Sequence, residues 1–75
     1  MKGIKEMTQC ERILKYMDDF GSISNREAFN DLGVGRLASR IHDLRRMGYN
    51  IVSETVQGKN RYDENVYYSK YSRAV

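Results

Sequence analysis

The sequence predicts an α+β domain in which three helices precede a two-stranded antiparallel β-hairpin. Up to Met47, apolar residues recur in three segments at the three- and four-residue spacing of amphipathic helices. After Gly48 the pattern changes to two segments rich in β-branched and aromatic residues, which is typical of strands. A chain of 75 residues has room for one domain with a modest core.

The first helix is expected to begin just after Thr8. Thr8 and Glu11 have the spacing of a capping box, in which each side chain bonds the backbone N–H of the other residue. Gly21 suits the left-handed conformation that commonly ends a helix. The apolar residues between these signals lie at helical spacing: Cys10, Ile13, Leu14 and Met17. We expect a flexible tail over 1–7, one domain over 8–72 and a C-terminal tail over 73–75.

A second capping box, Ser24 to Glu27, predicts a short helix over about 25–32. Its apolar residues Ala28, Phe29 and Leu32 are expected to point inward. The next three residues, 33–35, are Gly-Val-Gly, which permits a sharp turn with positive φ. Helix, tight glycine-containing turn and helix together form the helix-turn-helix pattern.

The third helix is predicted from about Arg36 to Met47, and Gly48 ends it. Its buried side is defined by Leu37, Ile41 and Leu44, with Ala38 beside them. The segment 35–48 also holds four arginines against a single aspartate, a local charge of +3 that equals the net charge of the whole chain. A basic helix face of this kind is typical of a surface that binds nucleic acid.

The two strands are predicted over 49–56 and 66–71. Turn signals occur both at Gly58 and at 63–65, so the position of the hairpin tip stays open. A lone hairpin is marginally stable, so it is expected to pack on the helices.

The order of these elements is the layout of a winged helix domain. The run LGVGRLASRIHDLRRMGYNIVSE, with the earlier TQ and SIS segments, resembles the short winged helix-turn-helix proteins of bacteriophages and prophages over roughly residues 8–71. The resemblance implies that the protein binds double-stranded DNA, as a small transcriptional or DNA-transaction regulator. It names no target sequence.

In such a domain the third helix enters the major groove with its N-terminal residues deepest. We expect Arg36 to reach base edges, with Ser39 and Arg40 on bases or phosphates and Arg46 on a phosphate. The start of the second helix and the hairpin are expected to add further contacts. Those residues are Asn25, Arg26, Lys59, Asn60 and Arg61.

Several alternatives stay open at the level of sequence. The third helix could simply be solvated, with Arg40 and Arg46 paired to Asp43. Arg45 flanks the buried side and is expected to have a structural role. The same scaffold could bind a host or phage protein, with the arginines facing an acidic surface. The hairpin tyrosines could cover the core, stack on single-stranded bases or form the seam of a homodimer.

Other classes of function find no support in the sequence. No phosphate-binding loop, metal-ligand spacing or convergent catalytic set is present, so we expect neither an enzyme nor a cofactor. His42 and Cys10 are the only residues of their types, and Cys10 is expected to be a buried thiol. No apolar run is long enough to cross a membrane, and a cytoplasmic protein is expected.

Overall fold

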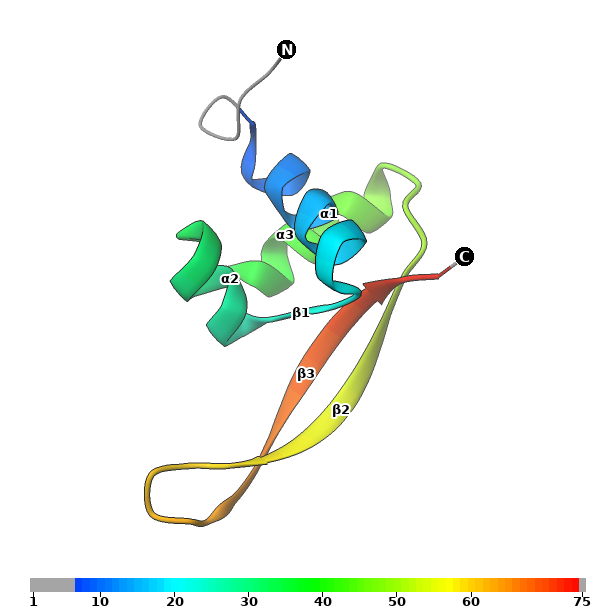
Figure 1. Cartoon of the computed structure of the whole chain (residues 1–75). Coiled ribbons are helices and arrows are strands. Elements are labelled where there is room, and N and C mark those ends of the chain that lie inside the picture. Colours follow the sequence, from blue (N-terminus) through cyan, green and yellow to red (C-terminus); the bar gives the residue numbers. More distant parts are fainter. Residues whose placement is uncertain (1–6, 75) are drawn as a thin grey trace.

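The computed structural model describes residues 7–74, and it is an α+β winged helix, as predicted. Three helices gather at one end, and a long twisted hairpin projects from them (Figure 1). In chain order the elements are α1 (Gln9–Phe20), β1 (Ile23–Ser24), α2 (Asn25–Leu32), α3 (Leu37–Arg46), β2 (Ile51–Lys59) and β3 (Asn65–Arg73).

Helix α1 has the predicted capping box. The Glu11 N–H donates to the Thr8 hydroxyl at 3.2 Å, and the Thr8 N–H donates to the Glu11 carboxylate at 3.0 Å. Ile13 and Met17 are buried as expected, while Cys10 and Leu14 are partly buried at the edge of the core. The core is completed by Tyr16, also on α1, and by residues from β1, α2, the turn before α3, α3 and β2: Ile23, Ala28, Val34, Leu37, Ile41, Leu44 and Ile51.

The sheet has a third strand that the sequence pattern did not reveal. The short strand β1 pairs antiparallel with β3, Ile23 opposite Tyr71 and Ser24 opposite Lys70, so that the order is β1-β3-β2. Two residues are too few to show strand periodicity, and the pairing depends on β3, which lies nearly fifty positions later. Through this pairing, β1 joins the base of the hairpin to the start of α2.

Helix α2 begins at the predicted capping box and ends at Gly33, whose φ of 69° is left-handed. The Gly33 N–H donates to Phe29 O, and the Val34 N–H donates to Ala28 O, so the turn closes tightly and Val34 enters the core. One expectation for this helix is wrong: Phe29 is 66% exposed rather than buried. The neighbouring Ala28, fully buried, already occupies the side of the short helix that faces the core.

Helix α3 is slightly shorter than predicted, because Arg36 is its N-cap and Met47 its C-cap. The predicted buried side is confirmed, since Leu37, Ile41 and Leu44 are each no more than 1% exposed. Their contacts with α1 and the turn fix the rotation of α3 about its own axis. The opposite side of α3 is therefore directed away from the core.

The hairpin is longer than predicted, and its tip lies at 60–64. Asp63 has a φ of 61°, and the Asn60 N–H donates to Glu64 O to close the turn. Gly58 lies within β2, where a Cβ atom would come to 2.9 Å of the Tyr68 ring. The absence of a side chain at Gly58 thus leaves space for the Tyr68 ring on β3, and Gly58 does not mark the hairpin tip.

The base of the hairpin is anchored to the helices by two arginines. Arg45 donates from Nε and Nη2 to Ile51 O, at 3.1 and 2.9 Å. Arg73 pairs with Asp18 of α1 at 3.1 Å and lies over the Tyr49 ring. Strand β3 includes Arg73, the first residue of the tail expected over 73–75. The tail expected over 1–7 falls, apart from its last residue, outside the described residues.

Tyr16 links α1 to α2 through its hydroxyl group. The hydroxyl donates to Asp31 Oδ2 at 2.6 Å and lies 3.4 Å from Glu27 Oε2. The hydrogen bond to Asp31, with burial and the two negative charges, raises the pKa of Tyr16 to about 12. The hydrogen bond exists only while the phenol is protonated, so this contact opposes ionisation.

We predict that Leu44→Ala lowers the free energy of unfolding by about 2–5 kcal/mol, because it opens a cavity beneath α3. Chemical denaturation followed by circular dichroism measures this loss. His42→Ala, on the exposed side of the same helix, is the control and should change stability by less than about 0.5 kcal/mol. Equal losses in the two variants would contradict the assigned orientation of α3.

We predict that Tyr16→Phe destabilises the protein at neutral pH and that this difference shrinks at alkaline pH. The folded-state pKa of about 12 lies above the ordinary value of 10, so the stabilisation is complete below pH 10 and is lost as pH rises toward 12. Melting temperatures of the two proteins across this range give the measurement. A difference that is constant with pH would rule out the hydroxyl contact as its source.

Candidate nucleic-acid interface

A groove runs between the N-terminal halves of α2 and α3. The capping box at Ser24 sets where α2 begins, and the turn at Gly33 places the start of α3 beside it. The sequence predicts DNA contacts for Asn25 and Arg26 at the start of α2 and for Arg36 and Ser39 at the start of α3, and all four line this groove. The other lining residues are Phe29, Gly35, Leu37 and Ala38.

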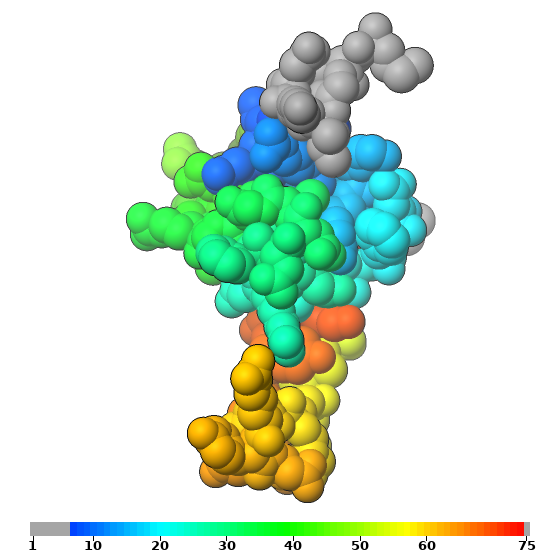
Figure 2. Space-filling view, turned by 60° about the vertical axis from the view of Figure 1, so that its left-hand side comes forward, coloured from blue at the N-terminus to red at the C-terminus, as the bar shows by residue number. Residues whose placement is uncertain are grey.

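A second concave surface lies between the start of α2 and the hairpin. Figure 2 shows a recess between the helical body, in teal and green, and the outer part of the hairpin, in yellow and orange. Asn25 and Arg26 line this recess as well as the groove, so the two adjoin at the start of α2. On the hairpin side the lining residues are Gly58, Lys59, Asn60, Val66, Tyr68 and Lys70.

Arg36 and Arg26 are the cations best placed along this surface. Both side chains are exposed, and within residues 7–74 neither makes a hydrogen bond or ion pair. Arg36 is the N-cap of α3 and Arg26 lies in the first turn of α2, where unpaired backbone N–H groups also favour an anion. Unpaired positive charge therefore lies at the N-terminal ends of both α2 and α3.

Arg40 has different surroundings from Arg36 and Arg26. It is half-buried, it pairs with Asp43 at 3.1 Å, and its Nε is buried without a hydrogen-bond partner among residues 7–74. Asp43 raises the pKa of the Cys10 thiol and Arg40 lowers it, so both charges lie near α1. Arg40 thus makes the ion pair considered in the solvated-helix alternative, and its contact with DNA stays a prediction.

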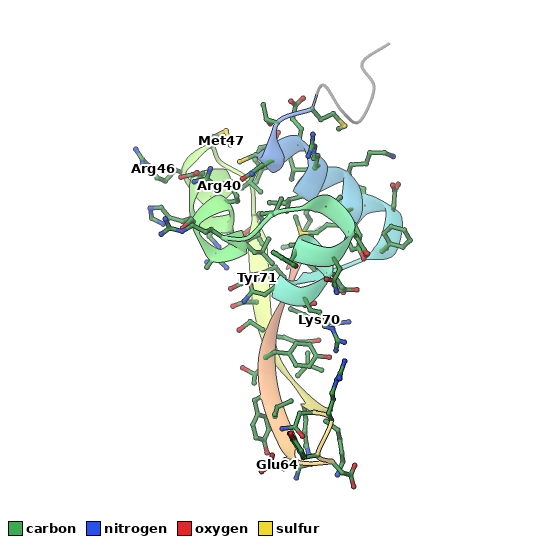
Figure 3. The ribbon with its side chains drawn as sticks, turned by 90° about the vertical axis from the view of Figure 1, so that its left-hand side faces the viewer. Arg40, Arg46, Met47, Glu64, Lys70 and Tyr71 are labelled. Atoms are coloured by element: carbon green, nitrogen blue, oxygen red, sulfur yellow. The ribbon has the colours of Figure 1, made fainter. Side chains whose placement is uncertain are left out.

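Arg46 and Arg45 are adjacent but have separate roles. Arg46 projects from the C-terminal end of α3 into solvent, beside the exposed Met47 (Figure 3). It makes no ion pair with Asp43 in the described part of the chain, in contrast to the alternative weighed from sequence. Arg45 holds the first residue of β2, which confirms the structural role expected for it.

The three predicted residues at the hairpin tip also differ from one another. The Asn60 side chain accepts from the N–H groups of Tyr62 and Glu64 and donates to the Glu64 carboxylate, so it is used to build the turn. Lys59 is 56% exposed and lies near Asp63, with 3.8 Å between Nζ and Oδ1. Arg61 is exposed and makes no ion pair among the residues the structure describes.

Lys70 is a candidate that sequence reasoning missed. It lies where the hairpin meets the helical body, opposite Ser24 in the β1–β3 register (Figure 3). No local motif marks this lysine, because it reaches the recess only through the pairing of β3 with β1. Of the hairpin tyrosines, Tyr71 packs on the core, which is one of the alternatives for this group, whereas Tyr62 and Tyr67 are 84% and 68% exposed.

The arrangement is that of a DNA-binding module with a helix-turn-helix and a wing. Comparison with known families agrees: the model of the family "Winged helix-turn-helix domain" matches residues 8–72, and the chain belongs to this family. No curated protein and no solved structure gives a significant match.

Two further findings concern other kinds of site. Among residues 7–74, no three His, Cys, Asp or Glu side chains gather where they could hold a metal ion, and no helix is long and apolar enough to span a membrane. Burial raises the pKa of the Cys10 thiol, and Asp43 adds to this effect while Arg40 opposes it. Cys10 is thus held in its neutral form, which is a poor nucleophile.

We predict that Arg45→Ala and Arg46→Ala separate stability from binding. Arg45→Ala should lower the free energy of unfolding by about 1 kcal/mol, because Ile51 O loses its charged donor. Arg46→Ala should leave stability unchanged and weaken binding to duplex DNA. Thermal melts and fluorescence-anisotropy titrations measure the two effects. The assignment is wrong if Arg46→Ala is the destabilising variant of the pair.

Proposed function

We propose that the protein binds double-stranded DNA with α3 in the major groove and the hairpin alongside as a wing. The observation that carries this proposal is the groove between α2 and α3, on which Arg36 and Arg26 are exposed and unpaired within the described structure. A helix about 10–12 Å in diameter fits a groove about 12 Å wide. The hairpin projects away from the helices (Figure 1), and Arg36 and Ala38 at the start of α3 are exposed.

In this mode Arg36 would read the DNA sequence. It precedes the first turn of α3, the part of the helix that lies deepest in the groove in such motifs. The guanidinium group can donate two hydrogen bonds to O6 and N7 of a guanine, which discriminates against other bases by about 1–3 kcal/mol. Ser39, half-buried one turn further along, would contact the adjacent base or its phosphate.

The other cations would hold the DNA backbone. Asn25 and Arg26 at the start of α2 would meet one phosphate strand, and Lys59, Arg61 and Lys70 would follow the same strand along the hairpin. Arg46 would meet a phosphate near the other end of α3. Such contacts release counterions and make affinity fall steeply with salt concentration.

The resemblance seen in the sequence extends the proposal to a regulator of transcription or of another DNA transaction, of phage or prophage type, acting in the cytoplasm. A net charge of +3 is small for tight binding by one copy. We therefore propose that two copies bind as a homodimer, one on each of two DNA half-sites about one helical turn apart. The alternative function is binding of an acidic protein partner by the same surface. The experiment below distinguishes this alternative from binding to DNA.

We predict that Arg36→Ala and Arg26→Ala weaken DNA binding in different ways. On a duplex selected from a random pool, Arg36→Ala should cost about 1–3 kcal/mol and relax the preference at one base pair. Arg26→Ala should weaken binding to all sequences alike and lower the slope of log affinity against log salt by about 1. Lys15→Ala, which removes the same charge from α1 outside the groove, should change neither quantity appreciably.

Titrations at several salt concentrations provide both readouts. Retention of full duplex affinity by the Arg36→Ala, Arg26→Ala double variant would overturn the proposed function. Loss of affinity to the same degree in Lys15→Ala would show that only the net charge matters, and it would remove the basis for assigning the groove.

A further inference from the structure

The groove between α2 and α3 also contains an apolar side chain that the proposed phosphate and guanine contacts do not use. Phe29 is 66% exposed and lines the groove beside Arg36 and Ala38. It lies one turn after Asn25 and Arg26, on the same side of α2. Large exposed apolar side chains on a polar surface commonly mark contact sites.

Contacts within the described residues leave the Phe29 ring largely exposed. The other strongly exposed phenylalanine, Phe20, packs its ring against Tyr16 with 4.6 Å between ring centroids. Phe29 has no ring or cation–π partner in the described residues. Its ring thus remains open to solvent in the groove, where a bound molecule would cover it.

The floor of the groove near Phe29 is also apolar and open. Ala38, the second residue of α3, is exposed, and a Cβ atom built on Gly35 would meet nothing within 4 Å. Arg26 and Arg36 flank this apolar spot with positive charge. The occupant must therefore be an anionic molecule that nevertheless presents small apolar groups.

Duplex DNA has such a group in its major groove, the 5-methyl group of thymine. Side chains such as alanine and phenylalanine contact this methyl group and so distinguish thymine from cytosine. We propose that Phe29, with Ala38 beside it, binds a thymine methyl group next to the base that Arg36 contacts. The preferred site would thus combine a guanine with a neighbouring thymine. This inference rests on the proposed function and adds a second sequence-reading contact to it.

The experiment removes the methyl group and the phenyl ring separately and together. Duplexes selected from a random pool are prepared with each thymine in turn replaced by uracil, which lacks only the methyl group. Loss of one buried methyl group should weaken binding of the unmodified protein about fourfold at the contacted position. Phe29→Ala should bind the thymine duplex more weakly and bind the thymine and uracil duplexes with nearly equal affinity.

Two controls accompany these measurements. Phe20→Ala also removes an exposed phenyl ring, and it should retain the fourfold difference between thymine and uracil. Replacement of a cytosine by 5-methylcytosine at the position of the contacted thymine tests whether a methyl group alone restores binding, and a gain is expected. Thermal melts confirm that Phe29→Ala is folded, as expected for an exposed position in a helix.

The inference is overturned if no thymine shows dependence on its methyl group, or if the dependence is the same in the unmodified protein and in Phe29→Ala. It is also overturned if Phe29→Ala leaves DNA affinity unchanged, which would assign the ring to a protein partner or to a second copy of the chain. Each of these results leaves DNA binding intact and is distinct from failure of the proposed function, in which the unmodified protein would not bind duplex at all.

Discussion

Burial of one side of α3 is the interaction on which the rest of the structure depends. Leu37, Ile41 and Leu44 are almost completely removed from solvent, and each contributes roughly 1.5–3 kcal/mol by burial of its side chain. In a domain of this size these three residues represent a large share of the net stability. Because they fix the rotation of the helix, they also determine which of its arginines point outward.

The turn before α3 is the second requirement. Gly33 adopts a left-handed conformation, and the hydrogen bonds of the turn bring Val34 into the core. The start of α3 is thereby held beside the start of α2, and residues from both helices line one groove. A looser connection would separate Arg26 from Arg36 and divide the basic surface.

Within residues 7–74 the hairpin is attached at its base, where Ile51 and Tyr71 meet the core and the arginine contacts to Ile51 O and Asp18 add to the attachment. Its outer half projects from the body (Figure 1), and most of its side chains are exposed. Its lysines and exposed tyrosines lengthen the accessible surface of the domain beyond α3, and the hairpin lines the recess at the start of α2.

Interactions between residues close together in the chain determined much of the fold, so the sequence alone could predict it. Capping boxes, glycine turns and apolar spacing act within a few residues, so the three helices, the turn, the hairpin and the basic character of α3 could all be predicted. The tertiary structure decided what depends on distant neighbours. Arg40 is half-buried and paired with Asp43, whereas Arg36 makes no ion pair within residues 7–74. Phe29 is exposed because Ala28 fills the core position, and Lys70 joins the site only through the pairing of β3 with β1. Helical periodicity specifies a direction around one axis, but whether a neighbour occupies that direction is set by the packing of the whole chain.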